Sequence, residues 1–123
     1  MKVWITGCAG FVGTRLSLAL ASAGHQVVGL SRRVCPSVEQ HACVDLASKS
    51  SGKKLEELAR DVGYPEVVVH AASLKPGPHN LQEYVRSNVM TTAVLLDALG
   101  QFPPNLLIYT STLNVYGRPS ANP

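Results

Sequence analysis

The sequence has few cysteines and no metal-binding cysteine pattern. Its 123 residues include three cysteines, Cys8, Cys35 and Cys43, and no two of them form a C-x-x-C pair. An odd number of cysteines without that spacing argues against a disulfide framework and a zinc site, and favours free thiols in a reducing compartment. We therefore expect no bound metal.

The sequence also lacks a long uninterrupted apolar segment. Met1 and Lys2 precede apolar residues, as in a secretory signal, but Thr6, Gly7 and Arg15 interrupt them. No run reaches the roughly 18 residues that a membrane-spanning helix needs. We expect a cytoplasmic chain with no membrane partner.

A concentrated basic surface is missing too. The net charge is only +3, and Arg32-Arg33 and Lys53-Lys54 are the only adjacent basic pairs. Duplex binding usually needs a basic stripe, so we expect no nucleic-acid partner, whereas a local pair suits a small anion. The oligomeric state stays open, a homodimer included.

Apolar runs of strand length alternate with helical segments. Strands are expected at residues 3–5, 26–30, 43–44, 66–70 and 106–109. Helices are expected at 11–23, from a cap at Ser50 or Ser51 to Gly63, and from a cap at Asn80 to Leu99. In the first helix, one apolar face should hold Val12, Leu16, Ala19 or Leu20, and Ala23.

This alternation predicts an α/β fold. Unbroken apolar strands indicate a parallel sheet covered on both faces, as in a Rossmann-type doubly wound fold. We expect the strand order 3-2-1-4-5, a domain over residues 1–117 and a frayed end over 118–123.

A glycine-rich loop joins the first strand to the first helix. Gly7, Gly10 and Gly13 follow the spacing G-x-x-G-x-x-G. They would allow a tight turn, close approach of a pyrophosphate and close packing of the helix, with the N–H groups of Phe11 and Val12 facing the anion. Turn geometry alone could also explain three glycines, but their place between a strand and an amphipathic helix favours dinucleotide binding. No G-K-[ST] follows, which excludes a Walker A loop.

The end of the second strand should contact the adenosine ribose. An acidic residue there would accept the 2′-hydroxyl of NAD, but this chain has Ser31, Arg32 and Arg33. Because arginine binds phosphate in bidentate fashion, NADP is favoured over NAD. The alternative is that one or both arginines are only solvated.

Five stretches occur in order along the chain: TGCAGFVG (6–13), VDL (44–46), VVVHAAS (67–73), YVRSNVMTTAVLLDAL (84–99) and LIYTSTLNVYG (107–117). Together they resemble the N-terminal part of an extended short-chain dehydrogenase/reductase of the NAD(P)-dependent epimerase/dehydratase family. HAASLK (70–75) is also similar to the corresponding stretch of nucleotide-sugar 4-epimerases.

The resemblance implies a cofactor site, with the pyrophosphate on residues 7–13. Asp45 and Leu46 would hold the adenine, with the Asp45 carboxylate accepting its exocyclic amine, although Asp45 could equally be a turn residue. The small residues Ala71, Ala72 and Ser73 would line the cofactor.

The resemblance also implies the nicotinamide end of the site. Lys75 would reach the nicotinamide ribose, although a lysine beside a proline is often just solvated. Asn88 would link the long helix to the catalytic strand, Thr110 and Ser111 would lie near the nicotinamide, and Thr112 would be the catalytic hydroxyl that binds the substrate oxygen. His70 is interpreted as a core histidine outside the site.

The general base of the family is absent. That base is a tyrosine followed four residues later by a lysine, but Tyr64, Tyr84, Tyr109 and Tyr116 have other residues there. We therefore expect a chain truncated before the catalytic helix and substrate domain, and inactive alone. Three hypotheses follow: the cofactor half of an enzyme that transfers hydride to or from a sugar nucleotide or similar hydroxyl or carbonyl substrate, a non-catalytic NAD(P)-binding regulatory or interaction module, or a structural fragment without a ligand.

Overall fold

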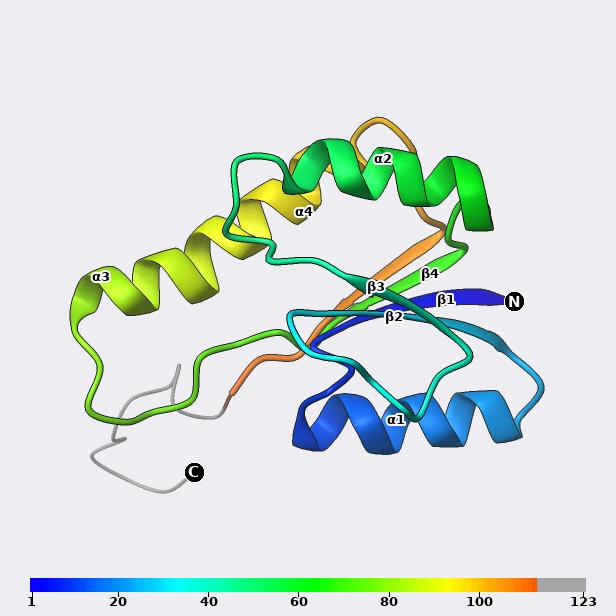
Figure 1. The fold of residues 1–123 in the computed structure, drawn as a ribbon, viewed down its shortest axis with the longest axis horizontal. Helices are drawn as coiled ribbons and strands as arrows, with labels where there is room; N and C mark the ends of the chain where they lie inside the picture. The colour runs from blue at the N-terminus through cyan, green and yellow to red at the C-terminus, as the bar shows by residue number, and fades with distance from the viewer. Residues whose placement is uncertain (113–123) are drawn as a thin grey trace, which may run out of the picture.

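A five-stranded parallel sheet forms the middle layer of the fold (Figure 1). The computed structural model describes residues 1–112, so the predicted domain end at 117 and the frayed end at 118–123 lie outside the described residues. The strands are β1 (Lys2–Thr6), β2 (Gln26–Ser31), β3 (Gln40–Cys43), β4 (Val67–His70) and β5 (Leu106–Tyr109). Their order, β3-β2-β1-β4-β5, confirms the predicted Rossmann-type topology.

Helices cover both faces of this sheet. Figure 1 shows α1 (Phe11–Ser22) on one face and α2 (Ser51–Val62) on the other, beside α4 (Thr91–Leu99). The predicted long helix before β5 is continuous but not uniform, because a π-helical segment, η1 (Val85–Met90), separates α3 (Leu81–Tyr84) from α4. The sequence pattern did not predict this change of helix type.

The central strands are buried on both sides, as the continuous apolar runs predicted. In β1, Trp4 belongs to the cluster under α2 and α4, whereas Val3 and Ile5 belong to the cluster under α1. The two outer strands are exceptions, because β3 has no buried residue and all four residues of β5 are exposed. The prediction of a sheet covered on both faces therefore holds for the central strands and not for β5.

The third strand lies earlier in the chain than predicted, at 40–43 instead of 43–44. Gln40 to Cys43 pair with residues 28–31 of β2 at the edge of the sheet. Side chains add to this pairing, since Gln26 Nε2 donates to Gln40 Oε1 at 3.2 Å. An edge strand needs little apolar character, so a search for apolar runs misplaced it.

The inner face of α1 is only partly the predicted one. Leu16 and Leu20 pack against the core as predicted. The fully buried residues are Gly13 and Ser17, whereas Val12 is 53% exposed and Ala19 and Ala23 are exposed as well. Small residues on the inner face let the helix approach the sheet closely, and a search for large apolar residues overlooks them.

The predicted helix ends agree with the structure within a residue. Gly24 and Gly63 follow α1 and α2 with φ of 80° and 88°, a backbone conformation that favours glycine. Asn80 and Glu83 form a reciprocal capping box at the start of α3, with hydrogen bonds of 3.0 and 2.9 Å. The predicted serine cap of α2 is not formed, because the hydroxyl of Ser51 donates to backbone carbonyls before the helix and Ser50 makes no capping bond.

Candidate cofactor-binding site

A cavity of about 610 Å³ extends along the carboxyl ends of the strands. This is where parallel α/β sheets bind their ligands, and the volume suits a small-molecule cofactor. Its wall contains sixteen of the predicted site residues: Gly7, Gly10, Phe11, Val12, Gly13, Ser31, Arg32, Arg33, Asp45, Leu46, Ala71, Ala72, Ser73, Lys75, Thr110 and Ser111. Asn88 and Thr112 are described by the structure but are not part of the wall.

The glycine loop brings three backbone segments into direct contact. Gly7 has a φ of 70°, and its N–H donates to the Leu30 carbonyl at 2.7 Å, which extends the pairing of β1 with β2. The tight turn after β1 is closed by the Gly10 N–H, which donates to the Gly7 carbonyl at 2.8 Å. A Cβ at Gly7 would lie 2.8 Å from Ala72 Cα. A Cβ at Gly13 would lie 2.7 Å from Cys8 Cα and overlap the Gly7 carbonyl. Gly7 and Gly13 thus hold β1, β4 and α1 at a distance that other residues would not allow.

The N-terminus of α1 opens into this cavity. Gly10 precedes the helix with an extended backbone, and the first helical hydrogen bond runs from Thr14 N–H to its carbonyl at 2.9 Å. The N–H groups of Phe11, Val12 and Gly13 precede that bond and have no partner within the helix. These groups and the helix dipole together suit an anion such as a pyrophosphate.

Positive charge gathers beside this helix end. The Phe11 ring is 65% exposed and lies 4.7 Å from the Arg15 guanidinium and 5.9 Å from Lys75 Nζ. Lys75 is therefore part of the cavity wall next to the glycine loop, which makes it available to an anionic ligand.

The end of β2 carries two arginines and a serine whose hydroxyl is already engaged. Ser31 Oγ donates to the Arg33 carbonyl at 2.5 Å and contacts His41 Nε2 at 3.0 Å. The serine therefore shapes the turn that presents Arg32 and Arg33. Within residues 1–112, the carboxylates in the cavity wall are Asp45 and Glu83, and neither lies on this turn.

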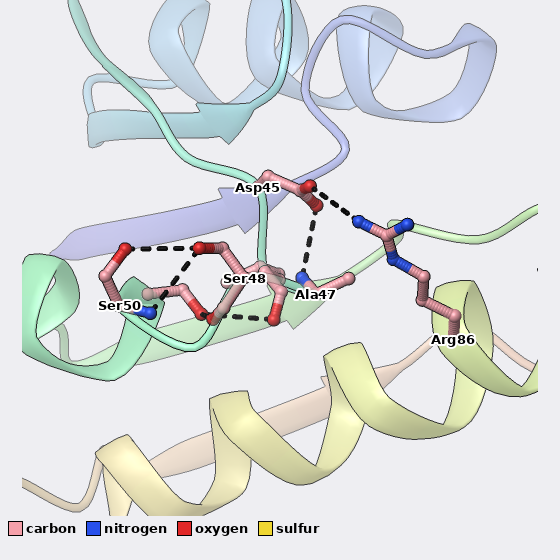
Figure 2. A network of polar contacts seen from close by, with 7 residues as sticks. Asp45, Ala47, Ser48, Ser50 and Arg86 are labelled. Atoms are coloured by element: carbon pink, nitrogen blue, oxygen red, sulfur yellow. Dashed lines mark hydrogen bonds and ion pairs between the residues drawn. The ribbon is translucent and has the colours of Figure 1, made fainter.

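Asp45 is both a turn residue and part of the cavity wall (Figure 2). Its Oδ1 accepts from Ala47 N–H at 3.1 Å, and its own carbonyl accepts from Ser48 N–H at 2.9 Å. Oδ2 faces Arg86 Nη2 at 3.7 Å. The two interpretations of Asp45 from the sequence are thus compatible.

His70 is a satisfied core histidine, as the sequence suggested. Thr6 Oγ1 accepts from the N–H groups of Ala71 and Ala72 at 3.2 and 3.1 Å, so its own proton points to His70 Nδ1 at 2.6 Å. Thr92 donates to the Asn88 carbonyl and therefore accepts from His70 Nε2–H at 2.9 Å. Burial lowers the pKa of His70. The neutral ring therefore joins β1, β4 and α4 behind the cavity.

Asn88 acts through the loop that follows β4. Its Oδ1 accepts from Leu74 N–H at 2.6 Å, and its Nδ2 donates to the Leu74 carbonyl at 3.4 Å. Farther along the loop, the Tyr84 hydroxyl accepts from Gly77 N–H at 3.0 Å and donates to the Gly77 carbonyl at 3.2 Å. These side chains fix the loop that carries Ser73 and Lys75, and the predicted link of Asn88 to β5 stays a prediction.

Thr110 extends the pairing of β5 with β4. Its N–H and its hydroxyl both donate to the His70 carbonyl, each at 3.1 Å. This places Thr110 and Ser111 at the edge of the cavity next to the β4 loop.

The helical side of the cavity was missed by the sequence analysis. Glu83, Arg86, Ser87 and Thr91 line it from α3, η1 and the start of α4. Residues 83, 87 and 91 recur at four-residue intervals, so helical periodicity from Asn80 would have placed them on one face.

The described residues add limits of other kinds. Within residues 1–112, no three His, Cys, Asp or Glu side chains gather as a metal site would require, and no helix has the length and apolar character to cross a membrane. Cys8, Cys35 and Cys43 are free thiols, the first two of them buried.

Known proteins match both the sequence and the fold. Residues 3–123 match the NAD dependent epimerase/dehydratase family. A UDP-glucose 4-epimerase from Corynebacterium glutamicum is 32% identical over 100% of this chain and 38% of its own length.

Two solved structures agree with this match. The UDP-glucuronic acid 4-epimerase from Bacillus cereus in complex with NAD is 29% identical with a TM-score of 0.78, over 98% of this chain and 43% of that one. MoeE5 in complex with UDP-glucose and NAD is 30% identical with a TM-score of 0.79, over 98% and 39%. The chain thus spans about two fifths of the length of these relatives. Because the family match covers nearly every residue, this chain belongs to the NAD dependent epimerase/dehydratase family.

Proposed function

We propose that this chain binds a nicotinamide dinucleotide in the cavity at the carboxyl ends of its strands, with NADP preferred over NAD. The observation that carries the proposal is the convergence of the glycine loop, the β2 arginines, Asp45 and the β4 loop on one cavity. The residues present fit the cofactor, because the α1 N-terminus offers N–H groups to the pyrophosphate and the glycines leave room beside it.

Each segment of the wall has a role in this proposal. The pyrophosphate lies against residues 10–13, and Asp45 and Leu46 hold the adenine. Ser73, Lys75 and Ser111 face the nicotinamide half. When bound, the nicotinamide supplies a hydride acceptor or donor, and the protein's part here is to bind and orient it.

The preference for NADP rests on Arg32 and Arg33. Two guanidinium groups follow β2, and neither of the carboxylates in the cavity wall lies on the turn after this strand. A 2′-phosphate would therefore gain charge-assisted hydrogen bonds there. We expect NADPH to bind about tenfold more tightly than NADH.

In the full enzyme, this cavity would serve hydride transfer on a sugar nucleotide or a similar hydroxyl or carbonyl substrate, with Thr112 binding the substrate oxygen. Both solved relatives are described with NAD, and one of them with UDP-glucose. The 123 residues hold no Tyr-x-x-x-Lys pair, so the isolated chain should bind cofactor without turnover. The second candidate is a non-catalytic NAD(P)-binding regulatory or interaction module, which would bind the cofactor in the same cavity.

The test is calorimetric titration of NADPH and NADH into the purified chain and two double variants. R32A/R33A should lose the preference for NADPH. K53A/K54A changes the other adjacent basic pair, which lies on α2 outside the cavity wall, and should keep the preference. Tighter binding of NADH to the wild type would overturn the preference alone. No binding of either dinucleotide would overturn the whole proposal.

A further inference from the structure

Arg86 approaches the cavity from the helical side and faces the carboxylate of Asp45. Figure 2 shows its side chain extending from the helix toward the loop after β3, where Nη2 lies 3.7 Å from Asp45 Oδ2. Both residues are in the cavity wall. The pair therefore connects two parts of the wall that belong to different segments, the loop after β3 and η1.

The carboxylate of Asp45 is divided between two tasks. Oδ1 is occupied by Ala47 N–H at 3.1 Å, which fixes the plane of the group. A carboxylate oxygen can accept more than one hydrogen bond. Oδ2, held toward Arg86, still has room for a donor that enters from the cavity.

The ion pair itself adds little to the stability of the fold. At 3.7 Å it is longer than a hydrogen bond, and the side chains of Arg86 and Asp45 are 68% and 41% exposed. Exposed pairs of this kind contribute little to stability. An exposed guanidinium group with several donors is instead suited to a ligand that lies beside the carboxylate.

We propose that Arg86 is a positioning residue for adenine recognition. It holds Oδ2 of Asp45 toward the cavity, so that this oxygen accepts the exocyclic amine of the adenine, and its guanidinium plane flanks the ring. The inference rests on the proposed function, since it assumes a dinucleotide with its adenine at Asp45.

The chain offers a closely matched control pair outside the cavity. Arg60 Nη2 lies 3.7 Å from Glu56 Oε2 on α2, with exposures of 67% and 40%. Arg86→Gln and Arg60→Gln therefore remove the same charge from nearly identical ion pairs, and only the first of them faces Asp45. Both variants should keep the melting temperature of the wild type.

The experiment compares NADH with reduced nicotinamide hypoxanthine dinucleotide, in which a carbonyl oxygen replaces the exocyclic amine. Neither carries a 2′-phosphate, so Arg32 and Arg33 affect both equally. The wild type should prefer NADH by about tenfold, because the carbonyl cannot donate to Asp45. R86Q should weaken NADH binding about three- to tenfold and narrow that preference, whereas R60Q should change neither.

Three results would overturn the proposal while leaving dinucleotide binding intact. They are a wild type without preference between the two ligands, an R86Q variant that binds like R60Q, and an R86Q variant that weakens both ligands by the same factor. A different outcome is that the wild type binds none of the three ligands: NADH, its hypoxanthine analogue and NADPH. The proposed function would then fail, and this inference would fail with it.

Discussion

Replacing Gly13 by alanine tests whether the glycine loop depends on direct backbone contact. The added Cβ would overlap the Gly7 carbonyl and lie 2.7 Å from Cys8 Cα. Neither neighbour is a flexible side chain that could move away, so we take the upper end of the usual overpacking cost, about 3 kcal/mol. Helix propensity offsets about 1 kcal/mol of this. The expected loss is therefore about 2 kcal/mol.

Gly52 is the matched control, because it also lies in the first turn of a helix and a Cβ there would have no atom within 4 Å. Gly52→Ala should stabilise the chain by about 0.5–1 kcal/mol. The assay is thermal unfolding followed by the fluorescence of Trp4, the single tryptophan, which is fully buried. G13A should lower the melting temperature by about 6–12 °C and G52A should raise it by a few degrees. The contact argument is refuted if G13A is as stable as G52A.

Three further predictions concern single side chains. Burial lowers the pKa of His70 from its ordinary 6.5, so below that pH the unfolded chain binds more protons than the folded chain. In urea unfolding, the free energy of unfolding should therefore be at its full value above pH 6.5 and should fall toward pH 5.5. His70→Gln should show a smaller fall. Asn88→Ala removes the acceptor of the Leu74 N–H, so it should speed hydrogen exchange at the Leu74 amide and weaken NADPH binding. Asn88→Asp keeps the acceptor and should restore the protection from exchange. Equal exchange in the wild type and both variants would contradict the role of Asn88 in fixing the loop. Burial raises the pKa of the Cys8 thiol to about 11, so a thiol reagent should modify exposed Cys43 quickly and Cys8 only after unfolding; fast labelling of both would contradict the packing.

The fold was largely predictable because its central strands and its helix ends carry strong local signals. The apolar runs of β1, β2 and β4 and the glycines after α1 and α2 act within a few residues, and the structure places them as predicted. The position of β3 was predicted wrongly, because its pairing with β2, rather than its own composition, makes it a strand. The π-helical segment was not predicted for a similar reason, since neither a capping residue nor an apolar periodicity marks residues 85–90.

The residues that line the candidate cavity were predictable where a motif is short and local, and not where two distant segments meet. The glycine loop, Asp45 and the β4 loop each follow a strand, and parallel strands bring their carboxyl ends together. No local sequence signal marks Arg86, because its place in the cavity wall depends on its approach to Asp45, which is distant in the sequence. The burial of Gly13 and Ser17 on the inner face of α1 was not predicted, because neither residue has a large apolar side chain.

The most direct test of the central claim is the ¹⁵N–¹H spectrum of the chain during titration with NADPH. If the pyrophosphate binds at the N-terminus of α1, the amides of Phe11, Val12 and Gly13 should shift most, because their N–H groups take the anion. The amides of α2, on the opposite face of the sheet, should stay in place. Saturating NADPH without shifts at residues 10–13, or with its largest shifts on α2, would contradict the account.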